Sequence, residues 1–209
     1  MIKIFEALFI LALDEDEGYI VESAVEKLET ALAGAVLAEL ALQERIEIRD
    51  NRVVVTNQVH LDHPVLDRAL NEIVDDTRLR KPRYWINTLA YQKVLREIGH
   101  DLVDQGVLFR HKKRLHLAAP FGEEQAPETS LKYSVKEHLR KMILAGGQPE
   151  LADQVLLSFL YYADLLRLVF TVGERKAASK QIRKLLQDSQ GNDHLSETLK
   201  TIVIAACER

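Results

Sequence analysis

The sequence has a single cysteine, Cys207, which excludes an internal disulfide. It has no opening segment with the charged-then-apolar pattern of a secretory signal peptide, so we expect a protein of the reducing cytoplasm. It also lacks an uninterrupted apolar run of the roughly 20 residues that span a bilayer, because Glu39, Asp164 and Arg167 break the two most apolar stretches. We therefore expect a cytoplasmic protein whose membrane contact would be peripheral, on the cytoplasmic face.

An excess of positive charge is missing as well. The 28 Lys and Arg residues are outnumbered by 32 Asp and Glu residues, which gives a formal net charge of -4. This balance argues against a generally basic nucleic-acid binder, although it leaves room for a local basic face. The distribution of charge therefore matters more than its sum.

Recognisable catalytic chemistry is the third absence. The sequence shows no nucleophile with a base partner, no phosphate-binding loop and no constellation of metal ligands, so we predict a protein that is not an enzyme and has no catalytic residues, metal or cofactor. His60-Leu61-Asp62-His63 offers metal ligands at close spacing, but no zinc-type partner occurs elsewhere, and we interpret it as a loop before a helix. Cys207 has no base near it in sequence and is interpreted as a buried structural thiol.

What the sequence does contain is helical periodicity over most of its 209 residues. The length and the 47% share of hydrophobic residues fit one globular domain. The fold class predicted is mainly α, with amphipathic helices around a central hydrophobic helix, for which residues 150–170 are the candidate. The other expected helices are residues 2–13, 30–42, 61–73, 84–105, 131–144, 174–187 and 193–206.

Two short β-hairpins are predicted between these helices. Residues 45–48 and 52–55 alternate around the turn-favouring pair Asp50-Asn51. Residues 107–109 and 115–117 flank the basic run Arg110-His111-Lys112-Lys113-Arg114. The second hairpin therefore ends in a concentrated positive charge.

Several single residues carry local predictions. Gly34, in the middle of an apolar helix, predicts close approach of a neighbour, and Ser130 is a candidate N-cap. Asp164 and Arg167 lie one turn apart in an apolar segment and predict a buried or half-buried ion pair. The stripe Lys132, Lys136 and Arg140 is interpreted as an ordinary solvated face.

The order of these segments resembles the Golgi phosphoprotein 3 family along nearly the whole chain. The matching features are an apolar helix, an acidic turn with Gly-Tyr, a second apolar helix with one Gly and one Glu, a Trp-Ile pair, an entrance to the second hairpin, and two late helices. They stand here at Ile4 to Leu13, Asp14 to Tyr19, Ala31 to Leu42, Trp85-Ile86, Leu102 to Leu108, Tyr161 to Leu166 and Arg175 to Leu186.

The resemblance implies a mostly helical fold, no known catalysis and, in the Golgi members, binding of phosphatidylinositol-4-phosphate at the membrane surface. In those members the headgroup is held by a tryptophan, an arginine and two further basic residues. These positions correspond here to Ala24, Ala33, Gln92 and Leu95, so that headgroup pocket does not carry over. The Golgi members also carry a basic N-terminal extension, and because this chain begins at the first helix we expect a bacterial-type member.

The leading hypothesis is a non-enzymatic peripheral protein that binds anionic membrane lipid, with a phosphoinositide-like headgroup as one candidate, through the basic hairpin and the adjoining helix. The expected lipid- or anion-binding residues are Lys93, Arg96, Arg110, Lys112, Lys113 and Arg114.

Alternative interpretations of the same hairpin remain open. It could be a solvated turn that protects a strand edge from aggregation, or a surface for self-association into a homo-oligomer or for an adaptor role. A winged-helix-like nucleic-acid module would also have a helix followed by a basic hairpin. Against nucleic acid stand Glu97, Asp101 and Asp104 on the would-be recognition helix, because exposed carboxylates would repel phosphates.

Overall fold

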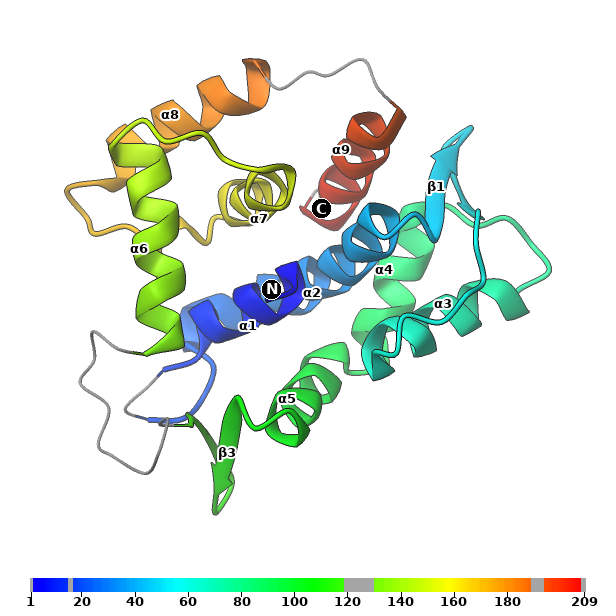
Figure 1. The fold of residues 1–209 in the computed structure, drawn as a ribbon, viewed down its shortest axis with the longest axis horizontal. Helices are drawn as coiled ribbons and strands as arrows, with labels where there is room; N and C mark the ends of the chain where they lie inside the picture. Colours follow the sequence, from blue (N-terminus) through cyan, green and yellow to red (C-terminus); the bar gives the residue numbers. More distant parts are fainter. Residues whose placement is uncertain (1, 15–16, 119–129, 189–193, 208–209) are drawn as a thin grey trace.

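Helices form most of the molecule and two short antiparallel hairpins complete it, which confirms the predicted fold class (Figure 1). The computed structural model describes residues 2–14, 17–118, 130–188 and 194–207. In chain order the elements are α1 (Ile4–Ala12), α2 (Glu22–Leu42), β1 (Ile46–Arg49), β2 (Arg52–Val55), α3 (Pro64–Asp75), α4 (Pro82–Tyr91), α5 (Val94–Asp104), β3 (Leu108–His111), β4 (Arg114–Leu117), α6 (Leu131–Leu144), α7 (Leu151–Tyr162), the short 3-10 helix η3 (Leu166–Leu168), α8 (Arg175–Asp188) and α9 (His194–Cys207).

The central helix is α2, and the prediction that residues 150–170 fill this place was wrong. α2 packs against α1, α3, α4, α5, α7 and α9, and its apolar residues from Leu28 to Ala41 are buried. Gly34 allows the close approach that its position predicted, because a Cβ there would lie 2.5 Å from Cβ of Ala206 on α9 and 2.9 Å from Cε1 of Phe159 on α7. The buried acid of this region, Glu39, accepts the backbone N–H of Ile4 at 3.1 Å and so stabilises the N-terminus of α1.

Residues 150–170 are divided because α7 ends at Tyr162. Asp164 adopts the left-handed conformation (φ 57°), and the N–H groups of Leu165 and Asp164 bond the carbonyls of Leu160 and Tyr161 at 2.8 and 3.2 Å. This is the Schellman pattern of helix ends. The predicted ion pair between Asp164 and Arg167 is also wrong: the Asp164 side chain is 80% exposed and pairs with Lys27, while Arg167 donates to the Asp164 carbonyl.

The helix predicted over residues 84–105 is in fact two helices. α4 ends at Tyr91, Lys93 takes a left-handed φ of 65°, and α5 begins at Val94. Arg68 from α3 braces this break, because its guanidinium donates to Gln92 at 2.8 Å and also binds Glu97. α5 then stops at Gly106, as predicted, with the Val107 N–H bonding the Leu102 carbonyl at 2.9 Å.

Both predicted hairpins are present. β1 and β2 pair from Ile46 with Val55 to Arg49 with Arg52, and Asp50 and Asn51 both adopt positive φ, as a type I′ turn requires. β3 and β4 pair from Leu108 with Leu117 to His111 with Arg114. The strands of this second hairpin are longer than predicted, so the turn itself consists of Lys112 and Lys113 only.

Among the described residues, no helix combines the length and apolar character needed to cross a bilayer. Ser130 caps α6 as predicted, accepting the Tyr133 N–H at 3.1 Å. Lys132 departs from the predicted solvated stripe, because it is buried and its Nζ donates to the Leu13 carbonyl.

Candidate anion-binding surface

A concavity of about 500 Å³ lies between the β3–β4 hairpin, α5 and the turn that precedes α2. Its apolar part is formed mainly by Phe9, Leu13, Leu95 and Leu115. The basic side chains that line it are Arg96, His100, Arg110, Lys112 and Lys113. None of the described residues that line this concavity is acidic, so we refer to it as the basic concavity.

Helical and strand periodicities bring these cations together. Arg96 and His100 are four residues apart and therefore share a face of α5. Arg110 pairs directly with Leu115 across the hairpin, so both side chains lie on the same side of the two strands, and the two turn lysines complete the wall. Phe109 and His116 form the neighbouring cross-strand pair on the opposite side, with their rings stacked 5.4 Å apart.

Gly99 allows the hairpin to lie close to α5. A Cβ at this position would come within 3.2 Å of both Leu115 and Phe9. This glycine and His100 were not among the predicted site residues. The spacing of His100 from Arg96 was the only sequence signal that could have found His100, and nothing in the sequence ties Gly99 to a hairpin.

The acidic turn before α2 contacts β4, the second strand of the hairpin. The Leu115 N–H donates to the Gly18 carbonyl at 2.9 Å, and Gly18 itself has a φ of 67°. The Arg114 guanidinium lies over the Tyr19 ring, 5.2 Å from its centroid, and its Nη1 is 3.8 Å from a Glu17 carboxylate oxygen. The acidic turn thus fixes the orientation of the hairpin.

The six predicted binding residues therefore separate into two groups. Arg96, Arg110, Lys112 and Lys113 line the basic concavity. Arg114 is engaged by the acidic turn and Lys93 is an exposed residue at the start of α5, and neither lines the concavity.

The positions that hold the headgroup in the Golgi members have different surroundings here. Ala24 and Ala33 are completely buried in the core. Gln92 is exposed and hydrogen-bonded to Arg68, and only Leu95 reaches the basic concavity. A headgroup pocket at those four positions is therefore closed by the packing of α2.

The charge argument against a nucleic-acid module is weaker than the sequence suggested. Glu97 is half-buried and its charge is paired with Arg68, and Asp101 is buried, so neither carboxylate is a free surface charge that would repel phosphates. Of the three acids, Asp104 alone is exposed.

A cluster of buried polar side chains lies on the face of α5 that points away from solvent. His63 Nε2 is 3.3 Å from Glu6 Oε1 and 3.5 Å from Asp101 Oδ2. The Gln105 amide nitrogen lies 3.1 Å and 2.7 Å from the same two carboxylates. The His60–His63 segment is indeed a loop before α3, but His63 turns inward from it and joins α1 to α5.

The protonation of this cluster follows from its contacts. The hydrogen bond to Glu6 raises the pKa of His63 against the opposing effect of burial. Burial tends to raise the pKa of Glu6, but hydrogen bonds from His63 and the Lys3 backbone outweigh it, so that the pKa of Glu6 is lowered. Burial raises the pKa of Asp101 despite its attraction to His63. The cluster is thus a buried proton site in which His63 Nε2 serves two carboxylates, whereas the buried Nδ1 of the same ring has no hydrogen-bond partner among the described residues.

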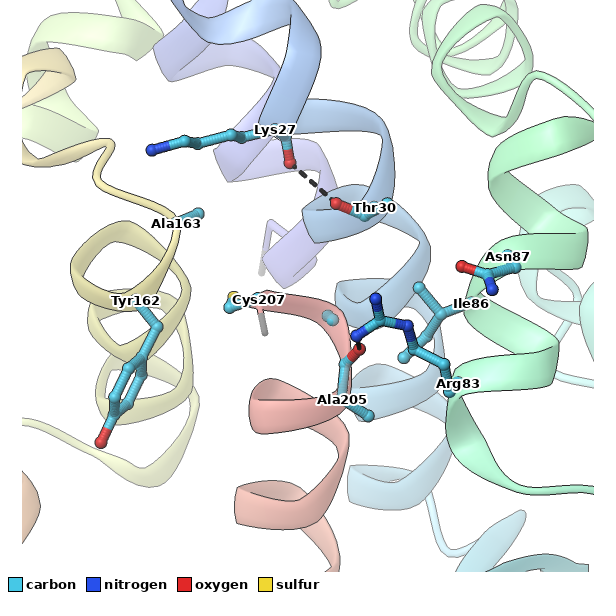
Figure 2. Close-up of a pocket in the computed structure, with 10 residues that line it drawn as sticks. Lys27, Thr30, Arg83, Ile86, Asn87, Tyr162, Ala163, Ala205 and Cys207 are labelled. Atoms are coloured by element: carbon cyan, nitrogen blue, oxygen red, sulfur yellow. Dashed lines mark hydrogen bonds between the residues drawn. The ribbon is translucent and has the colours of Figure 1, made fainter. Parts of the chain in front are cut away.

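A smaller cavity of about 280 Å³ lies among α2, α4, α7 and α9 (Figure 2). Its two cations are occupied: the Arg83 guanidinium donates to the Ala205 carbonyl at 3.2 Å, and Lys27 pairs with Asp164. Arg83 therefore stabilises the carbonyl end of α9. Cys207 also lines this cavity and is half-buried, whereas a buried structural thiol was predicted. Its partial burial raises the pKa of the thiol to about 12, so little of it is the reactive thiolate at neutral pH.

The fold and the basic concavity define a class: a helical protein that presents a basic hairpin beside an apolar-lined hollow. The family model of Golgi phosphoprotein 3 (GPP34) matches residues 4–205, and the chain belongs to this family. A search of curated proteins found no match.

Proposed function

We propose that this protein is a non-enzymatic peripheral protein that binds anionic membrane lipid through the basic concavity and the tip of the β3–β4 hairpin. The observation that carries the proposal is the convergence of Arg96, Arg110, Lys112 and Lys113 on one hollow whose described lining has no carboxylate. Its place would be the cytoplasmic face of a membrane.

The energetics favour reversible binding. Each Lys or Arg near an anionic surface contributes roughly 1 kcal/mol, so four such residues supply weak to moderate attraction that salt screens. Phe109 adds an apolar contact, because its side chain is 48% exposed at the same hairpin. An exposed aromatic ring on a basic hairpin suits the boundary between headgroups and acyl chains.

The ligand supported best is a single phosphate-bearing lipid headgroup. The hollow is of small-molecule size, and its donors are guanidinium and ammonium groups, which suit phosphate oxygens. A phosphoinositide would use different residues here from those of the Golgi members, because the corresponding four positions hold no basic residue and Arg96 and the hairpin cations line the basic concavity instead.

Vesicle co-sedimentation tests the proposal with a matched pair of variants. The test variant carries Arg110→Glu, Lys112→Glu and Lys113→Glu. The control carries Arg78→Glu, Lys81→Glu and Lys200→Glu, three exposed cations outside the lining of the basic concavity, so that the change in net charge is the same. Vesicles of phosphatidylcholine with increasing phosphatidylserine or phosphatidylinositol-4-phosphate should sediment the wild type and the control, but not the test variant.

Binding should weaken as salt is raised, because the attraction is electrostatic. The soluble headgroup inositol phosphate should compete only if the hollow itself recognises phosphate. If the wild type does not sediment with anionic vesicles at low salt, or if the two variants behave alike, membrane docking by this hairpin is refuted.

Self-association through the same hairpin is a second candidate function. The exposed Phe109 and the two-stranded form of the sheet favour it, because each strand pairs only with its hairpin partner among the described residues. Light scattering of the wild type and of Phe109→Ser distinguishes the two: a dimer that dissociates on this substitution supports an interaction role, whereas a monomer supports membrane docking.

A further inference from the structure

α8 carries a stripe of positive charge that the membrane-docking surface does not use. From Arg175 to Gln187 the sequence contains five Lys or Arg residues and no Asp or Glu. Four of the cations, Lys176, Lys180, Arg183 and Lys184, are exposed. Successive residues of a helix are about 100° apart, so these four lie on one side, while the buried Ala178 and Ile182 face the body.

These cations differ from an ordinary solvated helix face, where charges of both signs alternate. Within the described residues, none of the four side chains takes part in a hydrogen bond or an ion pair. The acid that precedes the helix, Glu174, is bound by Arg140 from α6 at 2.5 Å. Among the described side chains, the stripe is therefore a like-charged surface without an ion-pair partner.

A groove lined by apolar side chains and also by Gln181 and Lys184 runs beside the stripe. It has a volume of about 360 Å³ and lies between the end of α6 and α8. Met142, Leu144 and Leu185 supply its apolar walls, and Lys184 of the stripe stands on its rim. Leu144 is 41% exposed, so the groove offers water-accessible apolar surface directly next to unpaired cations.

The position of α8 separates this surface from the β3–β4 hairpin. In Figure 1 α8 lies along the upper edge of the molecule and the hairpin lies at the lower edge, with α1 and α2 between them. A membrane held by the hairpin would leave α8 facing away from the lipid.

We propose that the α8 stripe and the adjoining groove form a docking surface for an acidic amphipathic segment of a partner protein. Charge complementarity selects the partner: its carboxylates pair with Lys176, Lys180 and Arg183, and an apolar side chain between them enters the groove beside Leu144. A protein segment suits the surface better than a second membrane or a nucleic acid, because it can place carboxylates on the cations and an apolar side chain in the small open groove beside them. This inference goes beyond membrane docking and does not depend on it.

The test uses a fluorescein-labelled acidic peptide in which Leu recurs every three or four residues among Glu residues. Its binding to the full-length protein is followed by fluorescence anisotropy. The variant Lys176→Glu, Lys180→Glu, Arg183→Glu should weaken binding by at least about tenfold, as expected for loss of charge complementarity. The control variant Arg78→Glu, Lys81→Glu, Lys200→Glu should bind like the wild type, and so should the hairpin variant Arg110→Glu, Lys112→Glu, Lys113→Glu.

Two further variants test which chemical features of the peptide the α8 surface recognises. The Lys176→Gln, Lys180→Gln, Arg183→Gln variant should also lose binding, with its far-UV circular dichroism unchanged, which separates loss of charge from loss of folding. Leu144→Ser should weaken binding of the Leu-containing peptide but not of a Glu-Ser peptide. Equal effects of the α8 and control variants, or equal binding of a peptide with Gln in place of Glu, would overturn the proposal. Loss of vesicle binding in the α8 variant, with peptide binding intact, would instead identify a membrane as the occupant.

Discussion

At the scale of single residues, the buried proton site links stability to pH. Glu6, His63 and Asp101 come from α1, the loop before α3, and α5, and one imidazole nitrogen serves both carboxylates. A histidine whose pKa is raised in the folded state binds its proton more tightly there than in the unfolded chain. It therefore stabilises the fold below its ordinary pKa of 6.5 and loses this contribution as pH rises through the folded value.

We predict that the free energy of unfolding of the wild type decreases as pH rises above 6.5. The lowered pKa of Glu6 affects stability at acidic pH. The ionised carboxylate of Glu6 stabilises the fold above its ordinary pKa of 4.5, and this stabilisation is lost as pH falls through the pKa that Glu6 has in the folded state. Urea unfolding across this range measures the profile. His63→Gln should flatten the alkaline decrease, and an unchanged slope in this variant would show that the cluster does not control it.

Gly34 offers a second prediction at this scale, concerning packing. A methyl group there would overlap Ala206 and Phe159, and overpacking costs about 1–3 kcal/mol, whereas the gain in helix propensity from Gly to Ala is only about 1 kcal/mol. Gly34→Ala should therefore lower the free energy of unfolding in urea by about 1 kcal/mol. Adding Ala206→Gly should remove the closer of the two overlaps, the one with Ala206, so a double variant no better than the sum of its parts would contradict this explanation.

At the scale of elements, the β3–β4 hairpin depends on Gly18. This residue has a φ of 67°, and a Cβ would come within 2.8 Å of Arg114 and His116. Gly18→Ala should therefore break the hydrogen bond from the Leu115 N–H to the Gly18 carbonyl and speed hydrogen exchange of that amide.

Gly106→Ala is the matched control for this prediction. Gly106 has a similar φ of 73°, but a Cβ there would meet nothing within 4 Å. Both substitutions carry the cost of a left-handed alanine, about 1–2 kcal/mol, and only the one at Gly18 adds a clash with the hairpin. Equal exchange of the Leu115 amide in the two variants would attribute the effect to global stability alone.

Sequence patterns predicted the elements of this molecule better than their arrangement. The turn-favouring pair Asp50-Asn51 located the first hairpin, and apolar segments on either side of a basic run located the second. Gly106 marked the end of α5 and Ser130 the start of α6. The division at Lys93 escaped prediction because it needs a left-handed lysine braced by Arg68, a contact between segments far apart in sequence. The end of α7 before Asp164 was also not predicted, because no neighbouring residue in the sequence marks a helix end there.

At the scale of the whole molecule, the basic concavity was predicted in part. Runs of Lys and Arg identified the hairpin, and four of the six named cations line the hollow. The placement of Arg114 against Tyr19 and of His63 between two helices required the fold, because both contacts join distant parts of the chain. The central position was assigned to residues 150–170 instead of α2 for the same reason. Hydrophobicity predicts that both segments are buried, but it does not show which of them contacts more of the other helices.

The packing of α9 on α2 also has a consequence for how the protein is made. α9 is the last helix of the described chain, yet it covers the middle of the central helix, and its Thr198 accepts the N–H of Ile48 from β1 at 3.1 Å. A nascent chain that has not yet released α9 from the ribosome would expose the apolar surface around Gly34. The core can therefore close only after α9 has left the ribosome, and a chain cut short before α9 would be a substrate for chaperones or proteases.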